Sequence, residues 1–198
     1  MAVVSLSASR ERWVVDRRRH TSVEDGGAHD VTFADPPRSP LRRAVYRAPV
    51  WIYRLGLGGV LGSRFVLLTH RGRATGQVRQ VVLEVVGRED ASGGYLVASG
   101  YGARSQWFQN IRAEPRVLFQ VGWRRYRGSV HLLPPAESGA VLAAYARRHP
   151  AAADELMRAL GHDCGSGAQD RDAAYRRIGA DAERGVPVLA LRPAQPVD

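Results

Sequence analysis

The sequence predicts a mainly β domain with flanking helices, an α+β fold in which about six antiparallel strands form a closed or half-closed barrel. Short segments rich in β-branched and aromatic residues alternate with Gly and Pro turns, and few helical segments separate them. A hydrophobic share of 44% in 198 residues is sufficient for a sizeable core. The expected strands are Arg64–His70, Val78–Val86, Gly94–Ser99, Val117–Val121, Arg125–Leu133 and Val186–Arg192.

The chain divides at a proline-rich boundary. Residues 1–38 are charged and Gly-containing and end near consecutive prolines, so we expect a mobile leader, followed by a single domain over 39–198. Residues 41–61 have an apolar stripe and favour a helix that ends at a glycine cluster. Further helices are expected over 105–115, with Ser105 as N-cap, over 135–149 and over 151–160, and a short one is expected between the loop 161–169 and the last strand.

Composition excludes several kinds of chemistry. All 29 basic residues are arginine, and without lysine the chain cannot form a Schiff base or a Walker-type phosphate loop. The single cysteine, Cys164, excludes an intramolecular disulfide, and no group of residues has the spacing of a metal site. Neither a secretory signal nor a membrane-spanning run is present, so we expect a cytoplasmic protein.

A cationic turn between the first two expected strands is a candidate anion site. It reads His70-Arg71-Gly72-Arg73-Ala74-Thr75-Gly76, with Arg79 three residues further on. Guanidinium groups match phosphate and carboxylate oxygens, and glycine lets backbone N–H groups approach the same ligand. The alternative is an ordinary solvated hairpin turn.

The net charge of +10 leaves other partners open. The basic helix around Trp51 is a candidate for peripheral contact with an anionic membrane, against the alternative of a helix packed on a barrel. The strand from Trp123 to Arg127 alternates aromatic and basic residues, as a surface for single-stranded nucleic acid does, but a hairpin with solvated arginines is the favoured interpretation. We therefore expect no specific nucleic-acid partner.

Two blocks of the sequence resemble the deazaflavin (F420)-dependent nitroreductase and quinone reductase family of the split β-barrel flavin-binding superfamily. The first block runs from Leu68 to Leu83 and is similar to T-x-x-G-R-x-[ST]-G-x-x-R-x-x-x-L. The second joins Ala98-Ser99-Gly100 to residues 107–115 and is similar to A-S-x-G…W-[YF]-x-N-[LI]-x-A-x-P. Their order and spacing also match that family, and the likeness covers about residues 41–135.

The resemblance implies a split β-barrel that binds coenzyme F420, with FMN as the less favoured cofactor. By position, the phosphate and acidic tail would lie at Arg73, Ala74, Thr75 and Arg79, in the turn that also holds Arg71, Gly72 and Gly76. The residues that would line or close the ring pocket are Val97, Ala98, Ser99, Gly100, Gln106, Trp107, Phe108 and Asn110. A cationic turn suits the tail, and a glycine-bounded aromatic pocket suits a planar ring.

The expected reaction is hydride delivery from reduced F420 to an electron-poor conjugated acceptor such as a quinone, an enone or a nitro compound. Tyr101 and Ser99 are the candidate proton donors. Ala74 and Val82 depart from the family pattern, with Arg71 a candidate substitute for the charge missing at Ala74, and Ala151 and Ala152 replace a substrate-facing tyrosine of the nitroreductase branch. A cofactor-free binding protein, cyclase or isomerase on the same fold is the alternative, and either a monomer or a homodimer is compatible with the sequence.

Overall fold

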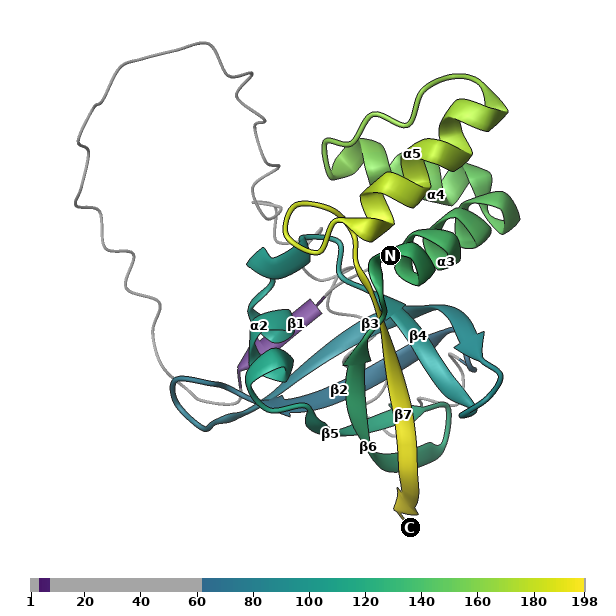
Figure 1. The fold of residues 1–198 in the computed structure, drawn as a ribbon. Helices are drawn as coiled ribbons and strands as arrows, with labels where there is room; N and C mark the ends of the chain where they lie inside the picture. Colours follow the sequence, from purple (N-terminus) through teal and green to yellow (C-terminus); the bar gives the residue numbers. More distant parts are fainter. Residues whose placement is uncertain (1–3, 8–61, 198) are drawn as a thin grey trace, which may run out of the picture.

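The computed structural model describes residues 4–7 and 62–197 of the chain, with side chains described for 62–194. It contains one seven-stranded antiparallel sheet with the order β1-β3-β2-β5-β6-β7-β4, and a further pairing of β4 with β3 closes six of these strands into a barrel (Figure 1). The expected mainly β, α+β class and the split-barrel fold are thus confirmed. The barrel strands are β2 Phe65–Arg71, β3 Val78–Glu89, β4 Gly94–Ala98, β5 Arg116–Val121, β6 Arg124–Leu132 and β7 Val188–Val197.

Strand β3 belongs to two parts of the barrel wall. Its first half pairs with β2, from Val78 opposite Arg71 to Glu84 opposite Phe65. Its second half pairs with β4 after a register shift between Val85 and Gly87. The sequence prediction ended this strand at Val86, whereas the observed strand continues to Glu89. The irregularity bends the strand and allows one continuous β3 to close the barrel.

Two hydrophobic clusters lie on the two sides of the barrel wall. Inward-facing residues such as Leu68, Leu83, Phe119 and Leu191 fill the interior together with side chains of helix α2, Gln106–Ala113. The second cluster joins outward-facing residues of β3, β4 and β7 to the C-terminal helices. Because alternate residues of a strand point to opposite faces, the short apolar strands of this chain can supply both clusters.

The C-terminal helices cover one outer side of the barrel (Figure 1). They are α3 Pro135–Arg148, α4 Pro150–Ala159 and α5 Ala168–Ala180. Prolines at the first turns of α3 and α4 are tolerated because those N–H groups have no partner inside a helix. Helix α5 begins inside the segment 161–169 expected to be a loop, and with 13 residues it is longer than the short helix predicted there.

One strand falls within the segment predicted as a leader. β1, Val4–Ser7, pairs antiparallel with β3, with Val4 opposite Val82 and Ser7 opposite Arg79. A four-residue strand is too short to be recognised from alternation, and its pairing partner lies more than 70 residues away in the chain. The rest of the leader and the expected helix 41–61 with Trp51 lie outside the described residues.

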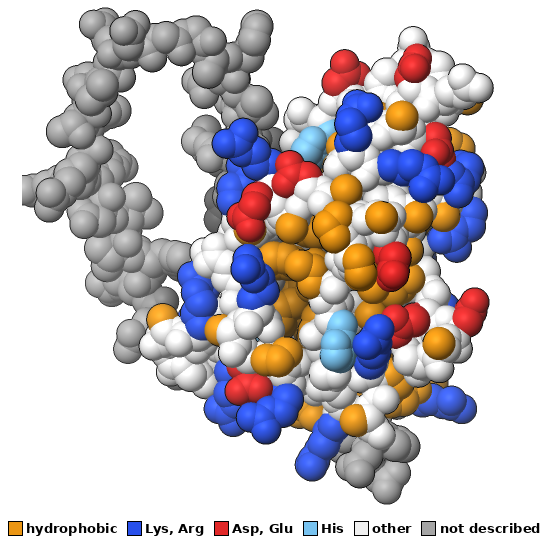
Figure 2. Space-filling model, viewed as in Figure 1, with side chains coloured by type: hydrophobic (Ala, Val, Ile, Leu, Met, Phe, Trp, Pro, Cys, Tyr) orange, Lys and Arg blue, Asp and Glu red, His pale blue; other side chains and the backbone are white. Residues whose placement is uncertain are grey.

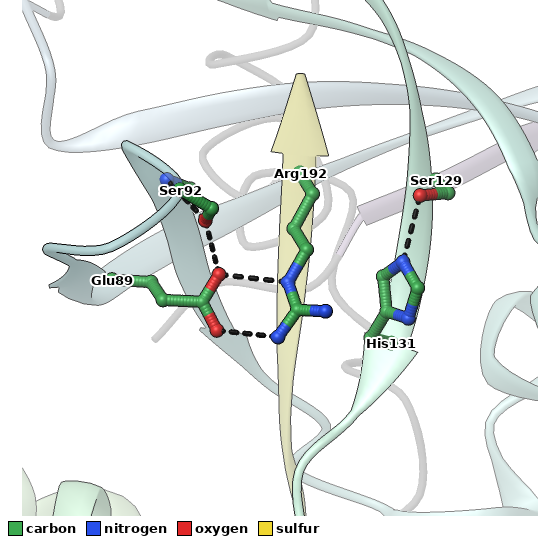
Figure 3. Close-up of polar contacts among 6 residues, drawn as sticks. Glu89, Ser92, Ser129, His131 and Arg192 are labelled. Carbon is green, nitrogen blue, oxygen red and sulfur yellow. Dashed lines mark hydrogen bonds and ion pairs between the residues drawn. The ribbon is translucent and has the colours of Figure 1, made fainter. Parts of the chain in front are cut away.

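An ion pair fastens the far end of β3 to β7. Arg192 donates from Nε and Nη2 to the two carboxylate oxygens of Glu89 at 2.8 and 2.7 Å, and Ser92 also donates to Glu89 (Figure 3). These bonds lower the pKa of Glu89 to about 2. On the neighbouring strand β6, Ser129 Oγ and His131 Nε2 are 2.8 Å apart. The Glu89–Arg192 ion pair thus joins β3 to β7, two strands that are separated by β4 in the sheet.

Charged side chains are spread over the surface that Figure 2 shows, with arginines at several separate places around its margin and hydrophobic side chains near its centre. This face has no continuous basic stripe of the kind that tracks a nucleic-acid backbone. Within the described residues, no helix combines the length and apolar character needed to cross a bilayer.

Candidate functional site

The cationic turn between β2 and β3 is compact because two glycines shape it. Gly76 has φ +66°, a backbone conformation that favours glycine, and Gly72 accepts hydrogen bonds from the N–H groups of Thr75 and Gly76. A Cβ at Gly72 would lie 2.9 Å from Arg79 Nε and 3.0 Å from Thr75 Oγ1. The missing side chain at residue 72 therefore provides the space in which Arg79 and Thr75 lie across the turn.

Arg73 joins this turn to helix α2. Asn110 Oδ1 accepts hydrogen bonds from the Arg73 backbone N–H and from its guanidinium, both at 3.1 Å, and Gln106 Oε1 accepts from the same guanidinium at 3.0 Å. Gln106 is exposed and Asn110 is 4% exposed, so the three groups run from the surface to the buried side of the helix. These contacts join residues that are 33 and 37 positions apart in the chain, so the cationic turn and helix α2 meet at Arg73.

His70 continues the network inside the barrel. Asn110 uses its carbonyl oxygen for Arg73, so its Nδ2 amide faces His70 Nδ1 at 3.4 Å and donates to it. His70 Nδ1 also lies 3.5 Å from the carbonyl oxygen of Arg71, which would accept from Nδ1–H in the other tautomer; the orientation of the Asn110 amide favours the tautomer with the proton on Nε2. Burial lowers the pKa of His70 below its usual 6.5, with Arg79 contributing, which favours this neutral form.

Two buried N–H donors below helix α2 lack an acceptor. His70 Nε2 and Trp107 Nε1 are both inaccessible and have no hydrogen-bond partner in the part of the chain that the structure describes. A buried polar group without a partner costs free energy, and few such groups occur in folded proteins. Both lie on the elements that the sequence assigned to the cofactor, one on β2 and one on α2.

The residues predicted to surround the ring are mostly interior. Val97, Ala98, Ser99 and Phe108 are fully buried, and Trp107 is 2% exposed. Trp107 packs edge-on against Phe108 with ring centroids 6.0 Å apart, and both belong to the barrel core. Their packing fixes the position of helix α2, and hence of Asn110 and Gln106 on the same helix.

The loop between β4 and α2 is held by serine hydroxyls. Ser99 Oγ lies 3.1 Å from the carbonyl oxygen of Gly102 and 3.0 Å from Ser105 Oγ. The predicted N-cap, Ser105, does stand at the N-cap position of α2, but its hydroxyl is engaged with Ser99 and makes no cap hydrogen bond. Tyr101 lies at the start of the short 3-10 turn Gly102–Arg104 and is 43% exposed.

The structure thus brings most of the predicted residues to one end of the barrel. Gly72, Arg73, Thr75, Gly76 and Arg79 share the turn, and Gln106 and Asn110 contact it directly. Arg71 is exposed and donates a hydrogen bond to the carbonyl oxygen of Gly76 at 3.3 Å. Ala74 is also exposed, and its methyl side chain offers a ligand no hydrogen-bond donor. Residues 97–100 are linked to this turn through α2.

The sequence analysis included His70 in the cationic turn but gave it no cofactor-binding or catalytic role of its own. The available signal was strand periodicity: Val66, Leu68 and His70 alternate on one face of β2, and the first two are in the barrel core. An inward histidine beside two arginines of the motif indicates a polar position within an otherwise apolar face.

Comparison with known families decides the identity of this arrangement. The model of the F420H(2)-dependent quinone reductase family matches residues 44–159, more than half of the chain. The chain belongs to this family. As a member, it is an F420H2-dependent oxidoreductase, which confirms the enzyme class and the cofactor expected from the sequence.

Comparison with solved structures finds several that resemble this chain at low sequence identity. An F420-H2 dependent reductase, FDR-A, is 20% identical over 65% of this chain and 94% of its own, with a TM-score of 0.43. A conserved hypothetical protein from Mycobacterium tuberculosis is 14% identical over 72% of this chain and 81% of its own, with a TM-score of 0.45. A pyridoxamine 5'-phosphate oxidase-related FMN binding protein from Nostoc punctiforme is 16% identical over 80% of this chain and 82% of its own, with a TM-score of 0.38. Comparison with curated proteins finds no match.

The donor set fits an anionic, planar cofactor. The turn offers guanidinium groups of Arg73 and Arg79, the Thr75 hydroxyl and a cradle that a Cβ at Gly72 would fill. The buried N–H groups of His70 and Trp107 add two donors for uncharged acceptor atoms such as carbonyl oxygens.

Proposed function

We propose that reduced F420 binds at the end of the barrel where the cationic turn meets helix α2, and that the enzyme passes a hydride to a quinone. The observation that carries this proposal is the anchoring of Arg73 by Gln106 and Asn110, because it joins the two motifs into one site. Enones and nitro compounds are the other members of the same acceptor class, since each offers an electron-poor conjugated system.

The phosphate and acidic tail of the cofactor are assigned to the turn. Arg73 uses Nη1 for its hydrogen bonds to both Gln106 and Asn110, so its other guanidinium N–H groups remain for a ligand. The same two bonds fix the position of the guanidinium before a ligand binds. Arg79 and Thr75 converge over Gly72. A preorganised guanidinium loses less side-chain entropy on binding than a free one. Arg71 stands at the edge of the same turn and supplies the charge that Ala74 lacks.

The deazaflavin ring is assigned to the region between residues 97–100 and the N-terminal part of α2. Val97 and Ala98 are fixed in β4 by pairing with Leu189 and Val188 of β7, so the backbone that leads to Ser99 and Gly100 is rigid. Trp107 Nε1–H supports this assignment as a buried donor that lacks an acceptor. A pocket built on a rigid scaffold can hold the reacting atoms at about 3–3.5 Å.

When bound, the reduced cofactor supplies a hydride from C5, and the chain must provide orientation and a proton. Of the two candidate donors, Tyr101 is favoured because it is partly exposed, whereas the Ser99 hydroxyl is fully buried and engaged with Gly102 and Ser105. Reduction of a quinone to a hydroquinone takes one hydride and one proton, so a single phenol re-protonated from solvent suffices.

Activity with defined acceptors tests this proposal. Purified protein should oxidise reduced F420 in the presence of menadione, and Tyr101→Phe should lower kcat without changing the Kd of F420. A matched control is Tyr126→Phe, since Tyr126 lies on β6 and stacks on Phe119 with ring centroids 5.2 Å apart. Tight F420 binding with no oxidation by quinones, enones or nitro compounds would contradict the proposal and favour the cofactor-free cyclase, isomerase or binding role.

We further propose a cytoplasmic enzyme, as a monomer or a homodimer. The single cysteine supports the compartment. Size-exclusion chromatography with light scattering distinguishes the two oligomeric states.

A further inference from the structure

A second candidate site lies on the outer face of β2, β5 and β6. Thr69 pairs with Leu118, and Leu118 pairs with Arg127, so these three residues form one row across the strands. In the next row, Arg71 pairs with Val78 and Arg116 pairs with Ser129. Along each strand these residues alternate with core residues such as Leu68, Val117 and Phe119. Because alternate residues of a strand point to opposite faces, both rows face outward.

This face is hollowed. A cavity of about 510 Å³ lies over it, a volume within the usual range for small-molecule sites. Its lining residues are Thr69, His70, Arg71, Val78, Arg116, Val117, Leu118, Arg127, Gly128, Ser129 and Ala194. Val78 and Leu118 are 49% and 47% exposed and are large aliphatic residues of its lining. We call this hollow the outer groove.

The charges of the outer groove have one sign. Arg71, Arg116 and Arg127 are all exposed and surround the apolar floor, and none of the described residues that line the groove is an Asp or Glu. Arg116 pairs with Glu114 through Nε at 3.0 Å, at a site where salt bridges are weak because both groups are solvated. The Arg127 backbone pairs with Leu118 in the sheet, and its guanidinium makes no hydrogen bond or ion pair with another described residue. An apolar floor ringed by guanidinium groups is complementary to a ligand with an alkyl part and an anionic head.

The shape and chemistry argue for one small molecule. Single-stranded nucleic acid is bound on aromatic platforms, and none of the residues lining the outer groove is a Phe, Tyr or Trp. A bilayer presents a broad surface, whereas the apolar floor here is hollowed. A single alkyl chain would cover Val78 and Leu118 and bring its head group to Arg116 and Arg127.

We propose that the outer groove binds a single-chain anionic amphiphile, with the alkyl chain over Val78 and Leu118 and a carboxylate at Arg116 and Arg127. The two arginines proposed to hold the carboxylate belong neither to the cationic turn nor to α2, whereas Arg71 borders both the outer groove and the turn. Burial of a few methylene groups contributes through the hydrophobic effect, and charge-assisted hydrogen bonds to guanidinium groups orient the head.

Calorimetric titration of the full chain with dodecanoate below its critical micelle concentration tests this proposal. Dodecyltrimethylammonium, of equal chain length and opposite charge, is the matched probe. The variants are Arg116→Gln with Arg127→Gln, and Leu118→Asp, all at exposed positions. Arg177→Gln on helix α5, far from the groove in sequence and exposed, controls for net charge. Unchanged melting temperatures show that each variant is folded.

The expected result is saturable dodecanoate binding that falls at least tenfold in the double Arg variant and in Leu118→Asp, and stays unchanged in Arg177→Gln. Equal binding of the cationic probe would overturn the proposal, because the arginines would then have no role. Binding only to phosphatidylglycerol vesicles would assign the face to a bilayer instead. Binding of an oligo-dT strand that the double Arg variant abolishes, without dodecanoate binding, would assign it to nucleic acid.

Discussion

Asn110 holds Arg73 by two hydrogen bonds to a single oxygen: its Oδ1 accepts from the Arg73 backbone N–H and from the Arg73 guanidinium, each at 3.1 Å. The backbone bond fixes the turn and the side-chain bond fixes the charge. An amide on helix α2 therefore determines where a cation of the β2–β3 turn is presented to a ligand.

Asn110→Ala should weaken F420 binding about tenfold although it removes no charge. The variant leaves the guanidinium held by the exposed Gln106 alone, so ordering it on binding costs more entropy, and a tenfold change corresponds to about 1.4 kcal/mol. Fluorescence titration of F420 measures the Kd. Arg112→Ala on the same helix is the control, because it removes a charge that makes only a 3.8 Å ion pair with Glu183. Equal Kd values for Asn110→Ala and the parent protein would contradict the anchoring role.

His70 should make cofactor affinity depend on pH. In the neutral form Nδ1 accepts from Asn110, whereas a protonated ring has two donors and repels the Asn110 amide. The pKa of His70 is lowered below 6.5, so F420 affinity should be full at neutral pH and fall as pH drops through the lowered pKa. Stability has the same sign, since the unfolded state takes up the proton first.

His70→Gln tests this pH dependence. The Gln side chain offers a non-titrating acceptor for Asn110, so affinity should be largely retained and its pH dependence below 6.5 should disappear. His131→Gln, on β6, controls for the loss of a histidine elsewhere. A pH profile identical in His70→Gln and the parent protein would assign the titration to another group.

Gly72→Ala should impair cofactor binding more than folding. A Cβ at residue 72 would press on Arg79 Nε at 2.9 Å and Thr75 Oγ1 at 3.0 Å, and both atoms belong to side chains that can change rotamer. We expect at least a tenfold rise in the F420 Kd with a small change in melting temperature. Gly93→Ala is the opposite case, because Gly93 has φ +64° and open space around it. This variant should lower the free energy of unfolding by about 1 kcal/mol and leave the Kd of F420 unchanged.

The Glu89–Arg192 pair should contribute to acid stability. The pKa of Glu89 is lowered to about 2, so its contribution is present above the unfolded-state pKa near 4.3 and is lost as pH falls towards 2. Glu89→Gln should lower stability by about 1 kcal/mol at pH 7, since both partners are partly solvated, and should flatten the stability profile between pH 4.5 and 2. Urea unfolding at several pH values measures this, and parallel profiles for variant and parent would refute it.

Local patterns were sufficient for most of the fold and for the two segments that the structure brings into contact at the candidate site. The turn from Arg71 to Gly76 and the helix from Gln106 to Ala113 were recognisable because glycine, arginine and apolar spacing act over a few residues. The position of β1 was not recognisable, since its pairing with β3 depends on contacts between distant segments. The tautomer of His70 likewise depends on which Asn110 atom Arg73 occupies, and this is a property of the assembled site.

The most direct test of the account is titration of the full chain with F420 and, separately, with FMN, following cofactor fluorescence in the parent protein, Arg73→Ala and the control Arg112→Ala. We predict F420 binding with a Kd of about 1 μM or below, a preference over FMN, and at least a tenfold loss in Arg73→Ala alone. Unchanged F420 affinity in Arg73→Ala would contradict the assignment of the cofactor to the junction of the cationic turn and helix α2.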